Sequence, residues 1–171
     1  MKKIILVGYM GSGKSTIGKK LASELMLDFI DLDDFIEKQE GTSITEIFKS
    51  KGEIYFRKAE HKALHSIVNN KTNFILSLGG GTPCYANNHE VLLHEEITSF
   101  YLKGSIATLT QRLTNEKGNR PILNQNSEDS LETFIAKHLF DRSYFYHQAK
   151  HIVTIDNKSV SDIVEQIKTM L

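Results

Sequence analysis

The chain contains few of the residues that mark secreted, fibrous or membrane proteins. Its 171 residues include one cysteine, two prolines and no tryptophan. The single cysteine, Cys84, cannot form an internal disulfide, which excludes a disulfide scaffold and fits a reducing compartment, so we expect a cytoplasmic protein. No apolar run approaches the roughly 20 residues of a membrane span, so we expect no membrane partner.

An excess of either charge is also missing. Lysine plus arginine and aspartate plus glutamate each number 21, so the formal charge at pH 7 is zero. A protein that binds nucleic acid through bulk electrostatics needs an excess of positive charge, so we expect no nucleic-acid partner. With 40% hydrophobic and 25% charged residues, the composition is that of a globular protein. We expect one domain over residues 1–171, acting as a monomer.

Hydrophobic patterning predicts strands and helices that alternate along the chain. Short apolar runs predict strands at 3–7, 29–32, 74–78, 97–102 and 151–155. Helical spacing of apolar residues predicts helices over about 14–26, 35–41, 43–48, 53–68, 87–95, 106–113, 131–146 and 161–170. This order predicts a three-layer α/β/α sandwich with a five-stranded parallel sheet. The polar stretch 115–127 is long for a connection, which predicts a mobile lid.

One stretch matches the phosphate-binding loop G-x-x-x-x-G-K-[ST]. Residues 8–15 read Gly-Tyr-Met-Gly-Ser-Gly-Lys-Ser and lie between a predicted strand and a predicted helix, as the motif requires. The backbone N–H groups of such a loop and the positive end of the next helix together hold phosphates. Lys14 would reach the β- and γ-phosphates, and the Ser15 hydroxyl would hold Mg²⁺. The motif predicts a nucleoside triphosphate site rather than a glycine-rich packing turn.

Two carboxylates follow the second predicted strand. Asp31 and Asp33 lie beyond its carboxyl end, where doubly wound sheets bind ligands, and they face the same way if this segment is extended. Phosphoryl transfer needs one carboxylate near the metal and one near the acceptor hydroxyl. No aspartate ends the third strand, so Asp31 is the candidate near the metal and Asp33 the candidate at the acceptor. Asp33 or Asp34 can also cap the next helix.

A glycine run and three arginines complete the set of candidates. Gly79–Gly81 follow the third strand and offer bare backbone N–H donors to a molecule that approaches closely. Arg57 follows an aromatic residue, Arg120 precedes one of the two prolines, and Arg142 lies near the end of a long helix. A solvated arginine is the default, but the guanidinium group is also the preferred clamp for carboxylate and phosphate.

Taken together and in order, these segments resemble the shikimate kinases, small P-loop kinases related to the nucleoside monophosphate kinases. The resemblance covers nearly the whole chain and rests on Gly11–Ser15, Asp31-Leu32-Asp33, Ile47-Phe48, Gly52-Glu53, Phe56-Arg57, Gly79–Gly81, Arg120–Leu123 and Arg142–Tyr144. It implies ATP-dependent phosphorylation of the 3-hydroxyl of shikimate, a step of chorismate and aromatic amino-acid biosynthesis, with Mg²⁺ as cofactor.

The resemblance also implies a role for each matching residue. Asp33, Lys14 and Arg120 would be catalytic, with Arg120 in the lid. The ATP phosphates would contact Gly11, Ser12, Gly13, Lys14, Ser15 and Thr16, and the adenine Arg112 and Asn157. Shikimate would contact Asp33, Arg57, Gly80, Gly81, Arg142, Phe48 and Phe56, mostly in an acceptor-binding helical region over about 33–62. Mg²⁺ would bind Ser15 and, through water, Asp31.

Two other kinds of function stay open on the sequence alone. Another small-molecule kinase, such as gluconate kinase or a nucleoside monophosphate kinase, would share the phosphate loop. A nucleotide-binding switch without turnover would share it too. A guanine-specific GTPase normally carries Asn-Lys-x-Asp, and the segment at 157–160 ends in Val160 instead.

Overall fold

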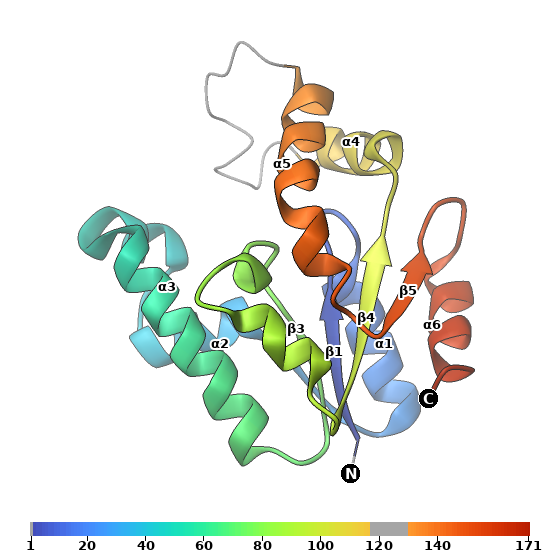
Figure 1. The fold of residues 1–171 in the computed structure, drawn as a ribbon, viewed down its shortest axis with the longest axis horizontal. Helices are drawn as coiled ribbons and strands as arrows, with labels where there is room; N and C mark the ends of the chain where they lie inside the picture. The colour runs from blue at the N-terminus through green and yellow to red at the C-terminus, as the bar shows by residue number, and fades with distance from the viewer. Residues whose placement is uncertain (1, 117–129) are drawn as a thin grey trace.

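The computed structural model describes residues 2–116 and 130–171 (Figure 1). Its strands are β1 (Lys3–Val7), β2 (Asp28–Asp31), β3 (Phe74–Ser77), β4 (Ile97–Lys103) and β5 (His151–Thr154). Its α-helices are α1 (Lys14–Leu25), α2 (Leu32–Glu40), α3 (Ile44–Asn70), α4 (Ile106–Asn115), α5 (Leu131–Tyr146) and α6 (Val160–Lys168). Two 3₁₀ segments are η1 (Thr82–Cys84) and η2 (Asn88–Leu93). Most of the lid expected over 115–127, with Arg120, lies outside the described residues.

The five strands form one parallel sheet, as the sequence predicts, and their order in the sheet is β2-β3-β1-β4-β5. β1 lies at the centre, between β3 and β4, and the chain leaves it toward β2 at one edge before it returns. Connections that leave neighbouring strands in opposite directions open a crevice at the carboxyl ends of those strands. The phosphate loop follows β1, so it lies in this crevice.

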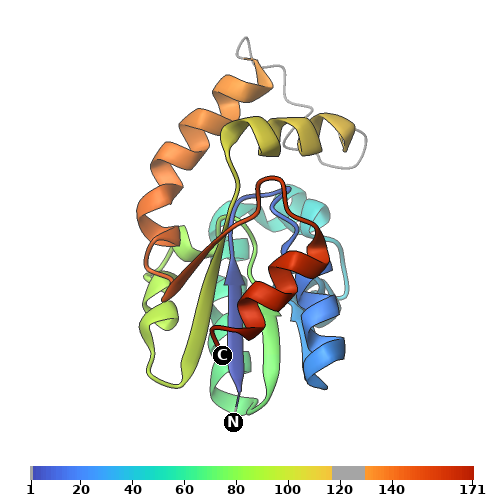
Figure 2. The ribbon, with the colours of Figure 1, turned by 90° about the vertical axis from the view of Figure 1, so that its right-hand side faces the viewer.

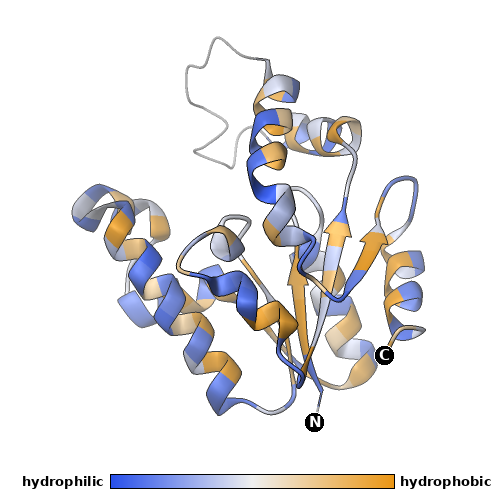
Figure 3. Ribbon diagram, viewed as in Figure 1, coloured by the Kyte–Doolittle hydropathy of each residue, from blue (hydrophilic) through white to orange (hydrophobic). Residues whose placement is uncertain are grey.

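The two faces of the sheet are covered by different helices. Ile4 and Leu6 of β1 pack in a core cluster with side chains of α1 and α6, whereas Ile5 and Val7 pack in a second cluster with side chains of α3, η2 and α5. Alternate residues of a strand point to opposite faces, so both faces of β1 are buried. Figure 2 shows the resulting layers and Figure 3 the apolar strands between them. The predicted three-layer sandwich is confirmed.

Two local features refine the predicted helices. α3 contains non-helical backbone at Gly52, with φ +83°, a conformation that favours glycine, so the short helix and the long helix predicted here are two helices joined at a kink. Ser43 begins the first of them, because its side chain accepts a hydrogen bond from the Glu46 N–H. The helix predicted over 87–95 is the 3₁₀ segment η2, whose tighter turn suits a short return to β4.

No helix among the described residues is long and apolar enough to span a membrane.

Candidate active site

The phosphate loop turns from β1 into α1 at the centre of the sheet (Figure 1). Gly11 and Gly13 have φ of +80° and +89°, which other residues rarely adopt, so the loop requires glycine at both positions. α1 begins at Lys14, so the positive end of its dipole faces the loop. Lys14 Nζ folds over the loop and donates to the carbonyl oxygens of Gly8, at 2.8 Å, and Tyr9, at 3.1 Å. The strand–loop–helix context predicted for the motif is confirmed.

Two cavities meet at this loop. The first, the α3-side cavity, has a volume of about 390 Å³ and lies between the loop, α2, α3, the glycine run and α5. The second, the α4-side cavity, has a volume of about 300 Å³ and lies between the loop, α4 and the start of α6. Met10, Lys14 and Ser15 line both cavities. A group held by Lys14 and Ser15 therefore lies between two binding spaces, as transfer between two bound molecules requires.

The α3-side cavity collects most of the predicted site residues. Those that line it are Lys14, Ser15, Asp31, Asp33, Phe48, Phe56, Arg57, Gly80, Gly81 and Arg142. They come from β2, α1, α2, α3, α5 and the glycine run, so segments far apart in the sequence supply one site. The rest of the predicted phosphate set, Gly11, Gly13 and Thr16, lines the α4-side cavity, and Ser12 is buried within the loop.

Asp31 connects the phosphate loop to the start of α2. Its Oδ2 accepts a hydrogen bond from Ser15 Oγ at 2.7 Å, and its Oδ1 accepts one from the Asp33 N–H at 3.1 Å. The prediction that Asp33 or Asp34 caps this helix is wrong: Asp31 keeps extended backbone and is the N-cap, while the other two lie in the first helical turn. Asp31 pairs with Ser77 at the end of β3, so it lies beside the strand end that lacks an aspartate.

Asp33 shares the α3-side cavity with Asp31, but not for the predicted reason. β2 ends at Asp31, so the two are not neighbours on one face of an extended segment, and the turn into α2 brings Asp33 to the cavity. Burial raises the pKa of Asp33 to about 6, and the charges of Asp31 and Glu60 act in the same direction against Lys14. Such a carboxyl group is ionised at neutral pH and accepts a proton more readily than an ordinary aspartate.

Arg57 reaches the α3-side cavity from α3 and is held on several sides. Its Nη1 donates to Glu60 Oε2 at 2.8 Å, and Thr82 Oγ1 donates to the other oxygen, Oε1, at 2.6 Å. Glu60 is only 1% exposed, so this pairing balances a buried charge. A Cβ at Gly81 would lie 2.9 Å from Arg57 Nη2, so glycine allows the guanidinium to pack there. The guanidinium also lies over the ring of Tyr85, with Cζ 3.9 Å from the ring centroid.

Arg142 reaches the same cavity from α5. A Cβ at Gly80 would lie 3.4 Å from Arg142 Nη1, which places the glycine backbone beside the guanidinium. One helical turn later, the buried Tyr146 donates its hydroxyl to the Gly80 carbonyl oxygen at 2.6 Å and so fixes this peptide. Two guanidinium groups and a fixed backbone thus converge on one cavity, a geometry that suits a small carboxylate.

Two aromatic side chains form an apolar wall of the α3-side cavity. Phe48 and Phe56 lie on either side of the kink at Gly52, and their ring centroids are 4.8 Å apart. Phe56 is buried, whereas Phe48 is 38% exposed at the rim. The cavity therefore offers one apolar surface and several charged or polar groups, as expected of a site for a small polar molecule with a carbon ring.

Of the two residues predicted to contact adenine, one lines the α4-side cavity and the other does not. Arg112 lines the α4-side cavity, and its Nη1 donates to the Gly11 carbonyl oxygen at 3.2 Å. Asn157 does not line this cavity, although the next residue, Lys158, does. Asn157 has φ +56°, as in a tight turn between β5 and α6. The structure thus brings Arg112 to the phosphate loop and leaves the Asn157 side chain outside the cavity lining.

Sequence reasoning missed three residues that hold the site in place. Glu60 follows Arg57 by three positions and Tyr146 follows Arg142 by four, spacings that place side chains on one helix face and could have indicated both pairs. Thr82 reaches Glu60 from η1, a contact between segments that no local pattern signals. These three residues orient the groups that line the α3-side cavity.

Comparisons with known proteins agree with this geometry. The family model for shikimate kinase matches residues 10–171. The shikimate kinase of Flavobacterium psychrophilum is 52% identical over 171 residues, which cover 100% of this chain and 99% of that protein.

Two crystal structures of shikimate kinases share the fold. The Bacteroides thetaiotaomicron structure has a TM-score of 0.89 at 35% identity, covering 99% of this chain and 97% of that one. The Acinetobacter baumannii structure, solved in complex with shikimate, has a TM-score of 0.88 at 31% identity, covering 99% and 92%. These matches decide between the kinases and the switch that the sequence left open: the chain belongs to the shikimate kinase family.

Proposed function

We propose that shikimate binds in the α3-side cavity and that ATP binds on the phosphate loop, with its nucleoside toward the α4-side cavity. Enzymes of the shikimate kinase family use ATP to phosphorylate the 3-hydroxyl of shikimate, a step of aromatic amino-acid biosynthesis, and this chain has that activity. The observation that carries the placement is that Lys14 and Ser15 line both cavities. The transferred phosphoryl group would lie against these two residues.

The α3-side cavity offers a partner for each part of shikimate. Arg57 and Arg142 would bind the carboxylate, since a guanidinium matches it with parallel N–H donors. The backbone of Gly80 and Gly81 lies between them and would contact the ring. The apolar wall of Phe48 and Phe56 would pack against the ring carbons. Asp33 would then face the ring hydroxyls from α2.

Asp33 and Lys14 would carry the chemistry. Asp33 would orient the 3-hydroxyl and accept its proton as the oxygen attacks the γ-phosphorus and the bond from that phosphorus to the β-phosphate oxygen breaks, which releases ADP. Its raised pKa of about 6 supports this role. Lys14 would neutralise charge on the transferred group, because its Nζ lies over the phosphate loop. Arg112 and Asn157 would contact the adenine. Arg112 would do so from the α4-side cavity and Asn157 from outside the lining of that cavity. Arg120, outside the described residues, is proposed to meet the phosphoryl group from the lid.

Mg²⁺ would be held by Ser15 Oγ and, through water, by Asp31. The two oxygens are 2.7 Å apart, and a hydroxyl and a carboxylate are the oxygen donors that Mg²⁺ prefers, so the residues fit the ion. Among the described residues no three or more histidine, cysteine or carboxylate groups are arranged as a metal site. When bound, Mg²⁺ would neutralise negative charge on the nucleotide phosphates.

We also propose that residues 1–171 form one domain, with an acceptor-binding region over about 33–62 and a lid over about 115–127. A single sheet supports both cavities, which favours one folding unit. We take the enzyme to act as a monomer in the cytoplasm. A chain with a single cysteine fits a reducing compartment.

The variant Arg57→Lys tests where the acceptor binds. Lysine keeps the charge but loses the paired donors. The KM for shikimate should rise roughly 10- to 100-fold if one charged hydrogen bond is lost, while the KM for ATP should change little. Lys49→Ala, an exposed cation on the same helix, is the matched control and should leave both constants unchanged. An unchanged KM for shikimate in Arg57→Lys would show that the carboxylate of shikimate does not bind in this cavity.

A further inference from the structure

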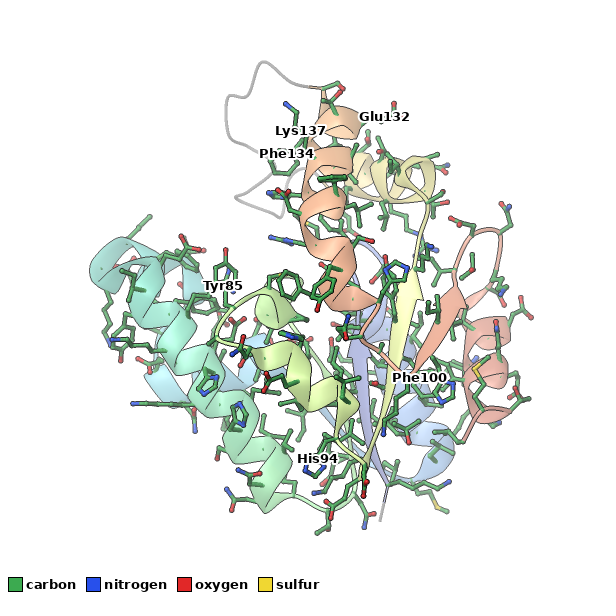
Figure 4. All side chains as sticks on the ribbon, in the orientation of Figure 1. Tyr85, His94, Phe100, Glu132, Phe134 and Lys137 are labelled. Carbon is green, nitrogen blue, oxygen red and sulfur yellow. The ribbon has the colours of Figure 1, made fainter. Side chains whose placement is uncertain are left out.

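We propose that Tyr85 is a positioning residue for shikimate binding, because its ring holds the Arg57 guanidinium in the orientation that meets the substrate carboxylate. The inference rests on the proposed function, since it takes Arg57 as the carboxylate ligand. The carrying observation is the cation–π contact, in which Arg57 Cζ lies over the Tyr85 ring, 3.9 Å from its centroid. Figure 4 shows Tyr85 beside α3, the helix that carries Arg57.

Tyr85 acts from outside the substrate cavity. Arg57 lines the α3-side cavity and also an outer groove of about 520 Å³ on the far side of its side chain, so it forms the wall between them. Tyr85 lines the outer groove and does not line the α3-side cavity. A molecule in the α3-side cavity therefore meets Arg57 and not Tyr85, and any effect of Tyr85 on that molecule passes through Arg57.

The ring supplies a constraint that the other partners of Arg57 do not. The hydrogen bond from Nη1 to Glu60 fixes one edge of the guanidinium but leaves its plane free to rotate about that bond. A ring in contact with the guanidinium limits this rotation, and the Tyr85 ring centroid, 3.9 Å from Cζ, is closer than that of Phe56, at 5.2 Å. Arg57 also forms a long ion pair with the exposed Glu53, whose Oε1 lies 3.7 Å from Nε, and without Tyr85 the guanidinium could shift further toward this carboxylate. Substrate would then have to reorder the side chain on binding.

The position of Tyr85 follows from the segment that carries it. η1 begins directly after Gly81, contains the buried Pro83, and ends at Cys84. Tyr85 follows as its C-cap and has extended backbone. This short segment supplies three contacts around one guanidinium: the close approach at Gly81, the Thr82 hydrogen bond to Glu60, and the ring of Tyr85. Pro83 has a fixed φ, which limits the conformations of this short segment and so helps to keep the Tyr85 ring in contact with the guanidinium.

The test compares variants of Tyr85 with a matched control on α3. Tyr85→Ala removes the stack, Tyr85→Phe keeps the ring, and Tyr85→Leu keeps apolar bulk without a π face. Tyr55→Ala is the control, because Tyr55 is 38% exposed against 39% for Tyr85 and its ring also lies over a cation, Lys51, at 4.3 Å, outside the α3-side cavity. Calorimetry gives the Kd for shikimate, and steady-state kinetics gives kcat and both KM values.

Tyr85→Ala should raise the Kd and KM for shikimate roughly 3- to 10-fold, the size of a partly desolvated cation–π contact, with kcat and the KM for ATP little changed. Tyr85→Phe should restore wild-type binding, Tyr85→Leu should not, and Tyr55→Ala should leave it unchanged. Adding Tyr85→Ala to Arg57→Ala should have no further effect on kcat/KM for shikimate, because the two residues act as one unit.

Other results would overturn the inference. Unchanged binding in Tyr85→Ala, full rescue by leucine, or equal losses in Tyr85→Ala and Tyr55→Ala would each show that the stack does not position Arg57. A Tyr85→Ala effect that persists in the Arg57→Ala background would show that Tyr85 acts by another route. If Arg57→Ala itself leaves the KM for shikimate unchanged, the proposed function fails, a result distinct from failure of the Tyr85 variants alone.

Discussion

Replacing Asp33 by asparagine should make the protein more stable and the enzyme slower. The pKa of Asp33 rises from 3.8 to about 6 on folding, mainly because of burial. A shift of two units corresponds to about 3 kcal/mol at most, and partial solvent screening reduces it to about 1–2 kcal/mol. Below pH 3.8 the carboxyl group is protonated in both the folded and the unfolded protein, so it does not lower the free energy of unfolding. Above pH 6 the group is charged in both, and the folded protein is destabilised by the full cost of burying that charge. Asparagine keeps the shape and avoids this cost.

Urea unfolding of both proteins at pH 8 and pH 5 measures the effect. The gain in the free energy of unfolding of Asp33→Asn should be larger at pH 8 and smaller at pH 5, where folded wild type is already largely protonated. kcat should fall roughly 10²- to 10⁴-fold if Asp33 is a general base. The control is Asp28→Asn, an exposed aspartate at the start of β2 and outside the α3-side cavity, which should change neither quantity. A less stable Asp33→Asn protein at pH 8, or a gain independent of pH, would refute the reasoning.

Two further substitutions test other parts of the site. Lys14→Ala should abolish most turnover in an ADP-release assay while the circular dichroism spectrum stays native, and near-normal turnover would show that Lys14 does not act on the phosphoryl group. Thr82→Val keeps the shape but leaves a buried Glu60 oxygen without its hydrogen bond, so urea unfolding should show a loss of about 1–3 kcal/mol. The KM for shikimate should rise too, and wild-type stability in this variant would show that the bond is unimportant.

The sequence predicts the order of elements because the signals for them are local. Apolar runs mark the strands, and the phosphate loop needs only its own glycines and the lysine that follows. Gly52 likewise separates the two helices that the structure joins at a kink. The cap of α2 was assigned wrongly because three aspartates lie within four residues, and only the backbone of Asp31 decides which of them caps the helix.

The contacts between distant segments that organise the site could not be derived from the sequence. Arg57 and Arg142 are recognisable as candidates, but their distance from the glycine run depends on how α3 and α5 pack on the sheet. Thr82 is 22 positions from Glu60, and Tyr146 is 66 positions from Gly80, so no periodicity links them. The resemblance to a family supplied roles for single residues, while the packed structure supplies the partners that hold them.

The most direct measurement of the central claim is acceptor-dependent ADP release by the purified enzyme with ATP and Mg²⁺. The panel contains shikimate, gluconate and nucleoside monophosphates, and the product is examined for the position of its phosphate. The account predicts rapid ADP release with shikimate alone among these acceptors, and a product phosphorylated on the 3-hydroxyl. ADP release that is indifferent to shikimate, or that is driven equally by gluconate or a nucleotide, would contradict it.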